Sequence, residues 1–561
     1  MAKAAKRGKG SGGQASRQRQ QQEAAARRRG PGPAAAGRPD TPAATGATPL
    51  AQTAAQAAER WYLDVSALRI QQWLARTPGL RFRRGGSVLL SEATEAKSWA
   101  GRLPAGTERN AEAGDIDGVV SLVLVDAADT ATTPATTPAT TPVEETARRA
   151  AAEVIRVMRE RMPYIHIQAV LGHGPNYAQA YAGMKRDRQD GTVLLDSPPA
   201  PPELVLAKPC DQCRSAPAVH RQVEIIKNKA PGDRDLDLCV ECNKRWQAGG
   251  GTRGIRRSPR PERELLRVLG ARGAPAQDLA DDFAGLAEGG RFRRDDAATQ
   301  VALIYADGNR IGDFLHKAGS ARNRTVSTRE IVRLIDDATI GALADAVLDR
   351  FADWKRPALI AHLAGGDDLL ISIPAVDAWQ FSRALLAAFG TRTRQAAPQG
   401  VSPPTMSAAL VFAHRSHPFS DLVRIAGKEL RAAKVATRGA EAAISFRDLT
   451  ADGGEQPGHR TPLTLAYLDR HAADLAGTEQ IPPSRRQALM ALFRQEAASD
   501  AVRRLTDFED NRPLWEVIAG RGATAAQVRD ELESSEEKRA ELRRLLDIAR
   551  HWRTRPREEA S

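Results

Sequence analysis

"LAGGDDLLISIP", residues 363–374, places two glycines and two aspartates between two short apolar runs. The runs have the length of strands, and glycine permits the positive φ that a tight hairpin turn needs. The segment therefore predicts a hairpin that carries Asp367 and Asp368 at its tip. An ordinary surface hairpin remains the alternative, because glycine and aspartate are both common in turns.

The segments around this hairpin alternate between strand and helix patterns. The pattern predicts eight elements: strand 301–306, helix 328–352, strand 358–364, strand 369–373, helix 377–389, strand 406–413, helix 420–435 and strand 442–447. We expect a polar turn after the first of these strands. The first six elements have the order of a ferredoxin-like fold, in which the first and third strands are antiparallel neighbours. Asp307, at the end of the first strand, should then face Asp367 and Asp368 across one strand spacing, about 5 Å.

Three carboxylates at this spacing repel one another unless a cation joins them. Clustered oxygen ligands suit Mg²⁺ or Mn²⁺, and two such ions support in-line phosphoryl or nucleotidyl transfer. Gly365 and Gly366 would let a triphosphate approach without Cβ clashes, and Gly308 would expose its carbonyl and amide to metal or phosphate.

A second α/β pattern precedes the first. A strand from residue 61 runs into a helix, "GGSVLLSEATEAKSWA" (85–100) reads as a glycine turn followed by a helix, and 117–129 is an apolar run of strand length. A repeated "TTPATTPATTP" (132–142) predicts an exposed insertion before a helix at 144–161.

All four cysteines lie between these two units, in "CDQC" and "CVEC". Two Cys-x-x-Cys pairs separated by 25 residues predict a tetrahedral, structural Zn²⁺ site. Its ligands would be Cys210, Cys213, Cys239 and Cys242. Free thiols or a redox pair are the alternatives.

The net charge of +13 is concentrated in one segment. Residues 1–58 hold ten Lys and Arg against two acidic residues, so they carry +8, and the other 503 residues carry only +5. The segment has few large aliphatic residues, so we expect a disordered basic tail. No apolar run is long enough to span a bilayer and no secretory signal is recognisable, so we expect a cytoplasmic protein with no membrane partner.

Several segments resemble the large palm-domain subunit of type III CRISPR effector complexes. "YADGNRIGDF" (305–314) and the GGDD hairpin resemble its second, cyclase palm, as do "MSAALVFAHRSHPFSDLVRIAGKELRAAK" (406–434) and "ISFRDL" (444–449). "LDVSALRIQQWLA" (63–75) with "GGSVLL" resembles its first, degenerate palm. The resemblance covers about 61–450 and is strongest over 299–450.

This resemblance implies an α/β (α+β) chain of two ferredoxin-like palms, a zinc module between them and a C-terminal helical domain. The expected boundaries are a tail 1–58, a first palm 59–204, a zinc module 205–250, a helical linker 251–298, a second palm 299–455 and a helical domain 456–561. No His-Asp dipeptide occurs, so we expect no nuclease of the kind that family often carries.

Carried over by position, Asp307, Asp367 and Asp368 would bind two catalytic Mg²⁺ or Mn²⁺ ions. Gly365 and Gly366 would abut the nucleotide, as would Gly308. Two further residues have implied roles: Asn309 would contact metal-bound phosphate, and Lys434 would neutralise phosphates. A solvated helix end is an equal alternative for Lys434.

The predicted function is a nucleotidyltransferase that converts ATP to cyclic oligoadenylates in antiviral defence. The 3′-hydroxyl of one nucleotide would attack the α-phosphate of the next. Guide or target RNA and other effector subunits are possible partners. Two alternatives remain: an RNA-binding scaffold subunit and a cyclase that makes a dinucleotide or uses GTP.

Overall fold

The computed structural model describes eleven stretches of the chain: residues 59–114, 117–125, 142–199, 208–222, 235–249, 258–280, 282–288, 299–320, 328–450, 461–494 and 498–554. The expected tail over 1–58 lies outside these residues, as does the repeated insertion up to residue 141. Among the described helices, none combines the length and the apolar character needed to cross a membrane.

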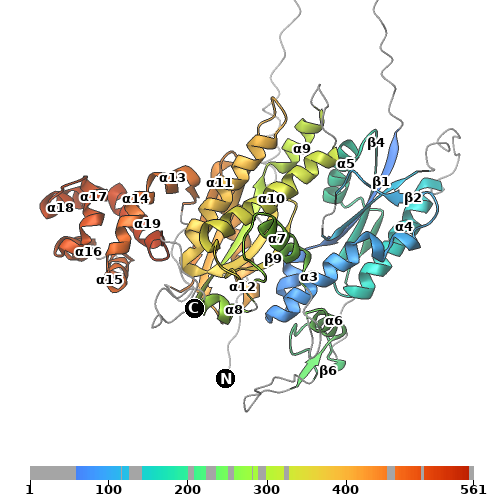
Figure 1. Ribbon diagram of the computed structural model, residues 1–561, viewed down its shortest axis with the longest axis horizontal. Coiled ribbons are helices and arrows are strands. Elements are labelled where there is room, and N and C mark those ends of the chain that lie inside the picture. Colours follow the sequence, from blue (N-terminus) through green and yellow to red (C-terminus); the bar gives the residue numbers. More distant parts are fainter. Residues whose placement is uncertain are drawn as a thin grey trace, which may run out of the picture. The chain divides into compact units, whose positions relative to one another are not determined.

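The first palm is a five-stranded sheet with the order β2-β3-β1-β4-β5. Its strands are β1 (Arg60–Leu68), β2 (Thr107–Arg109), β3 (Val119–Leu124), β4 (His166–Gly174) and β5 (Leu195–Ser197). Its helices are α2 (Ile70–Ala75), α3 (Leu80–Thr94), α4 (Pro142–Arg161) and α5 (Tyr177–Asp190). Alternate residues of β1 face opposite sides of the sheet. Leu63 and Val65 lie in the core with α3 and α4, whereas Tyr62 packs with α5 (Figure 1, blue to teal).

The second palm is built on a six-stranded sheet with the order β13-β12-β11-β8-β10-β9. Its strands are β8 (Gln300–Asn309), β9 (Ile360–Gly365), β10 (Asp368–Pro374), β11 (Thr405–His414), β12 (Ala443–Asp448) and β13 (Leu463–Thr464). Its helices are α9 (Ile311–Ser320), α10 (Thr328–Phe351), α11 (Ala378–Ala396) and α12 (Phe419–Thr437). The four strands β11-β8-β10-β9 form the expected ferredoxin-like sheet, and β2-β3-β1-β4 repeat the same order in the first palm.

The two faces of the second sheet have different neighbours. Ile304 and Ile371 belong to the large core with α10 and α11. On the other face, Leu303 and Leu370 pack with α12 and with Ala75 of the first palm. Asp307 lies four residues after Leu303, and Asp368 lies two residues before Leu370. Because side chains alternate along a strand, both aspartates lie on the face that carries α12 and meets the first palm.

The expected glycine turn at residues 85–86 is wrong, because both glycines lie inside α3. Helix α6 (Val240–Ala248) packs closely on α3 at this point, and a Cβ on Gly85 would lie 1.8 Å from the carbonyl oxygen of Arg245. Glycine is therefore required by close helix contact and not by a turn. The polar turn expected after Asp307 is mostly helix, because Phe314 and Ala318 of α9 pack against α10.

Seven α-helices follow the second palm in the described part of the chain. They are α13 (Leu465–Arg470), α14 (Ala472–Gly477), α15 (Pro483–Arg494), α16 (Ala498–Thr506), α17 (Arg512–Ala519), α18 (Ala525–Ser534) and α19 (Glu536–Ala549). Most of their buried side chains form a core of their own. The segment that follows α19 contacts the palm: His551 stacks on Phe412 with ring centroids 4.2 Å apart, and its Nε2 lies 3.0 Å from Asp448 Oδ2.

Candidate active site

The turn between β9 and β10 brings the predicted carboxylates together. Asp368 is the direct partner of Asp307 in the antiparallel pair β8–β10, and it also pairs with Gly365 of β9. Gly366 and Asp367 are therefore the two loop residues. Gly366 has φ +59°, a left-handed value that glycine adopts without strain, as in the first position of a type II′ turn. The expected proximity of Asp307 and Asp368 is confirmed by this register.

The site carries crowded negative charge. Burial raises the pKa of Asp367 to about 8, and repulsion and hydrogen bonding from Asp307 add to the effect. Burial and repulsion from Asp307 likewise raise the pKa of Asp368 to about 7, although Lys434 and Gln71 oppose the shift. Carboxyl groups of this kind favour a bound proton or a bound cation over the free anion. A cluster of carboxylate oxygens fits Mg²⁺ or Mn²⁺.

Lys434 reaches the site from α12. Its Nζ lies 2.5 Å from Asp307 Oδ2 and donates to the carbonyl oxygen of Gly308 at 2.8 Å. The side chain is therefore part of the carboxylate cluster and does not extend freely into solvent. The amide of Gly308 donates to the carbonyl oxygen of Asp367 at 3.2 Å, so both backbone groups of Gly308 have partners within the protein.

Three of the proposed nucleotide contacts differ in their surroundings, which are open for two glycines and closely packed for Asn309. Gly365 has no described atom within 4 Å of the place where a Cβ would stand, and the same holds for Gly366. Asn309 is only 2% exposed, and its Nδ2 donates to Thr405, Ser407 and the carbonyl of Glu441. The amide nitrogen of Asn309 therefore connects β8 with β11 and with the segment that precedes β12.

One side chain of the first palm also enters the site. Gln71 of α2 donates from Nε2 to Asp368 Oδ2 at 3.2 Å. A glutamine on a short amphipathic helix has no sequence feature that distinguishes it from a surface residue. Its part in the site depends on how the first palm packs against the second, which the sequence pattern does not specify.

A cavity of about 1370 Å³ opens beside the carboxylates between the two palms. The first palm contributes Arg69, Trp73 and Arg76, and α12 contributes a row of cations. This row is Arg424, Lys428, Arg431 and Lys434, and Arg438 extends it as the residue that follows the helix. Asp307 is the member of the carboxylate cluster that lines this cavity. Positive charge along the wall beside a carboxylate cluster suits a polyanion whose reacting phosphate meets a metal.

The four cysteines converge as their spacing predicts. Their sulfur atoms all lie within 4.8 Å of one another, and Cys213 Sγ is 3.8 Å from Cys239 Sγ. This separation suits four thiolates around one Zn²⁺ at about 2.3 Å each, so the cluster fits a zinc module. Strands β6 (His220–Gln222) and β7 (Leu236–Leu238) form the small sheet of this module.

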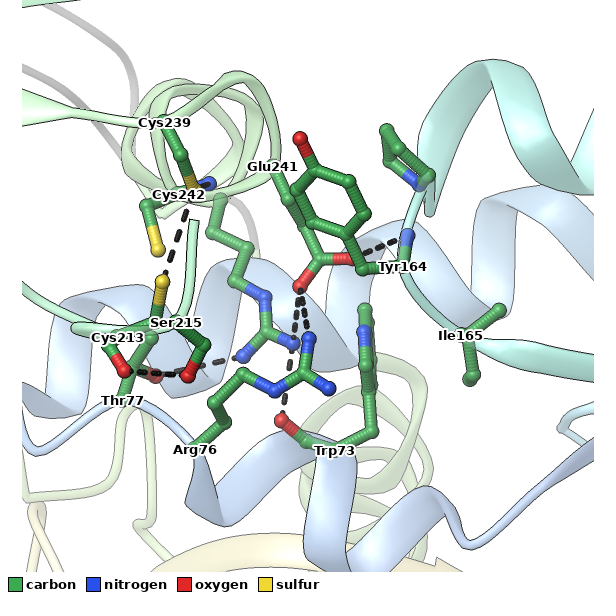
Figure 2. Close-up of polar contacts among 12 residues, drawn as sticks. Trp73, Arg76, Thr77, Tyr164, Ile165, Cys213, Ser215, Cys239, Glu241 and Cys242 are labelled. Atoms are coloured by element: carbon green, nitrogen blue, oxygen red, sulfur yellow. Dashed lines mark hydrogen bonds and ion pairs between the residues drawn. The ribbon is translucent and has the colours of Figure 1, made fainter. Parts of the chain in front are cut away.

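Helix α6 of the cysteine module is fastened to the first palm. Arg245 is fully buried, and its guanidinium lies 3.9 Å from the ring centroid of Trp73. It donates to the Trp73 carbonyl and to Glu241, each at 2.9 Å. Glu241 in turn accepts from the amide of Tyr164 at 2.9 Å, and Figure 2 shows its carboxylate between Tyr164 and Arg76. Trp73, Arg76 and Tyr164 all line the cavity between the palms, so the module supports one wall of it.

The chain has two sheets with the same strand order, and the second sheet carries a turn with adjacent carboxylates. These features define a protein with two palm domains. Residues 300–442 match the family model for Cas10/Cmr2, second palm domain. Residues 300–442 are thus similar to the second palm domain of the Cas10/Cmr2 family. No curated protein matches its sequence.

One solved structure supports the fold, and two others are weaker matches. The crystal structure of Csm1 in T. onnurineus matches with a TM-score of 0.51 and 14% identity, over 89% of this chain and 70% of that one. Two structures of a Csm1–Csm4 cassette, in complex with cA4 and with AMPPNP, each match with a TM-score of 0.47 and 12% identity, over 88% of this chain and 70% of that one.

Proposed function

We propose that this chain is a nucleotidyltransferase of a type III CRISPR effector that converts ATP to cyclic oligoadenylates. The observation that carries the proposal is the register of Asp307 opposite Asp368, with Asp367 in the adjoining turn. Three carboxylates converge there beside a cationic cavity. The choice of ATP as the substrate rests on the similarity of residues 300–442 to the second palm domain of Cas10/Cmr2.

The residues of the chain divide the chemical work. Two Mg²⁺ or Mn²⁺ ions at Asp307, Asp367 and Asp368 would lower the pKa of an attacking 3′-hydroxyl and neutralise the pyrophosphate that leaves. The cations along α12 attract and orient the triphosphate. Gly365 leaves open space at the turn, so a nucleotide can approach the backbone there.

The test is incubation of purified protein with each nucleoside triphosphate and Mn²⁺ or Mg²⁺, with the products separated by mass. The variant Asp367→Ala/Asp368→Ala removes two ligands, and Asp353→Ala is a matched control because Asp353 is exposed and lies outside the site. We expect cyclic oligoadenylates from the wild type and from Asp353→Ala, and none from the double variant.

RNA and effector subunits are added in a second arm, because an enzyme of an effector complex can require its partners. If the products are cyclic dinucleotides or are made from GTP, the assigned product or substrate would be wrong, but the reaction would still be nucleotidyl transfer. Absence of product in both arms, together with co-purified RNA, would replace the proposal with a scaffold role.

A further inference from the structure

We propose that Asp336 and Arg260 are positioning residues that fix the carboxylate turn and tie it to the corresponding turn of the first palm. The inference deepens the proposed function and rests on it. Neither residue contacts a candidate metal ligand through its side chain in the described structure, and neither belongs to a recognisable motif.

Asp336 holds the backbone of the turn. It lies in α10, and its Oδ1 accepts the amide N–H of Gly366 at 3.0 Å. Gly366 is a loop residue, so its amide has no partner strand across the hairpin. A side-chain acceptor at this point fixes the peptide that precedes Asp367. Because Asp367 and Asp368 follow directly, the orientation of Gly366 sets where their carboxylates point.

Arg260 lies between two carboxylates from different palms. It is the first residue of α7 (Arg260–Ala271), and prolines flank it on both sides, which restrict the backbone at the helix start. Its Nη2 lies 4.0 Å from Asp336 Oδ2, and its Nη1 lies 3.4 Å from Asp117 Oδ1. One guanidinium therefore attracts both carboxylates and bridges the two palms.

Asp117 belongs to the turn of the first palm. It lies between β2 and β3, whose hairpin occupies the same place in the sheet order as β9–β10 in the second palm. Its side chain is 6% exposed, and its Oδ2 accepts the hydroxyl of Ser91 at 2.7 Å. A buried carboxylate depends on such partners, so Asp117 holds Arg260 firmly.

The turn of the first palm also packs on α10 directly. A Cβ on Gly114 would lie 3.3 Å from Val332, one turn before Asp336. The chain of contacts thus runs from Asp117 through Arg260 and Asp336 to the amide of Gly366. The first palm contributes its own turn as an anchor for the turn that carries the chemistry. Small displacements of reacting groups reduce rates strongly, so this anchor matters for turnover.

The test compares Asp336→Ala with Asp336→Asn. The amide oxygen of asparagine still accepts the Gly366 N–H but no longer attracts Arg260. Asp337→Ala is the matched control, because Asp337 is the exposed neighbour on the same helix. Two readouts are needed: the Kd for Mn²⁺ from direct titration of nucleotide-free protein, and kcat with KM for ATP.

We expect Asp336→Ala to weaken Mn²⁺ binding by about tenfold and to lower kcat by more than KM changes, because the ligands are misplaced. Asp336→Asn should recover most of the Mn²⁺ affinity. Arg260→Ala should show a smaller loss, partly restored by Arg260→Lys. If Asp336→Ala fails to fold, Asp336→Asn and the two Arg260 variants decide the question through the same readouts.

The outcomes separate the two proposals. If Asp367→Ala/Asp368→Ala abolishes Mn²⁺ binding and turnover while Asp336→Ala and Arg260→Ala behave like Asp337→Ala, the positioning inference is overturned and the proposed function stands. If the wild type itself neither binds Mn²⁺ nor makes product with its partners present, both proposals are overturned.

Discussion

Lys434 Nζ lies 2.5 Å from Asp307 Oδ2, so a lysine ammonium shares a carboxylate oxygen with the candidate metal site. The ammonium reduces the repulsion among the three aspartates, and a metal ion must compete with it for Asp307. When a triphosphate binds, the same ammonium can turn to its oxygens. Lys434 therefore has opposite effects on metal binding and on nucleotide binding.

Replacing Lys434 should separate these effects. For Lys434→Met we expect Mn²⁺ to bind about tenfold more tightly without nucleotide, and KM for ATP to rise about tenfold, each equivalent to about 1.4 kcal/mol. Lys428→Met is the control for the Mn²⁺ titration alone, because Lys428 belongs to the same cationic row of the cavity and its loss should also raise KM. Equal Mn²⁺ affinities in the two variants would show that Lys434 does not compete with the metal.

Replacement of Gly308 by alanine and replacement of Gly365 by alanine should have different effects on Mn²⁺ binding and turnover. A Cβ on Gly308 would lie 2.5 Å from Ile311 Cγ1 and 2.8 Å from Asp367 Cβ, so Gly308→Ala must displace the turn. We expect it to lower both Mn²⁺ affinity and kcat by about tenfold or more.

Gly365→Ala meets no described atom within 4 Å, so it should leave Mn²⁺ binding unchanged and raise only KM for ATP. Titration of Mn²⁺ and steady-state kinetics on both variants check this pair. A loss of Mn²⁺ affinity in Gly365→Ala would show that this glycine is needed by the fold and not by the nucleotide.

The raised carboxyl pKa values predict a pH dependence. Burial and repulsion from Asp307 raise the pKa of Asp367 to about 8 and the pKa of Asp368 to about 7, above the ordinary value of about 4. Between about pH 4 and pH 8, the folded state therefore binds more protons than the unfolded state. The free energy of unfolding should fall as pH rises through this range. Mn²⁺ must displace these protons, so its affinity should rise over the upper part of that range.

Urea unfolding of metal-free protein at pH 5, 6.5 and 8.5, together with Mn²⁺ titration, checks the sign. The variant Asp367→Asn/Asp368→Asn should be less sensitive to pH over this range. If the free energy of unfolding of the variant falls with pH as steeply as that of the wild type, other groups cause the pH dependence.

The buried pair Arg245–Glu241 should stabilise the junction between the cysteine module and the first palm. Arg245→Met leaves Glu241 without its principal cation, and breaking such a buried pair costs about 3–5 kcal/mol. We expect a lower melting temperature with the zinc content unchanged, because neither residue is a cysteine ligand. Adding Glu241→Gln should recover part of the loss, and a double-mutant cycle measures the coupling. Additive losses would show that the two side chains act independently.

Much of the second palm could be predicted because its signals are local. The apolar runs set the strands, and the fold order then placed Asp307 beside Asp368 without any knowledge of distances. The cysteine cluster followed from spacing alone. In both cases the residue types that carry the chemistry are rare or adjacent in sequence, so a pattern makes them visible.

Contacts between elements far apart in the chain could not be predicted in the same way. Gly85 and Gly86 suggested a turn, because nothing in the sequence reveals that α6 packs against α3 there. Gln71, Asp336 and Arg260 are ordinary helix residues by type. Their positions depend on how two palms and a connecting helix pack, and that information is spread over whole surfaces.

Helix α6 carries Cys242, and Cys239 is its N-cap residue. Through Arg245 the same helix binds Trp73, which lines one wall of the cavity. Under the proposed function, a chelator would therefore act at two places: it would remove the ions bound by the aspartates, and it would also remove the Zn²⁺ that holds the cysteine module against the cavity wall. Inactivation by EDTA alone could not be assigned to either centre. Substituting Ca²⁺ for Mg²⁺ while the thiolate-bound ion is left in place avoids this confusion.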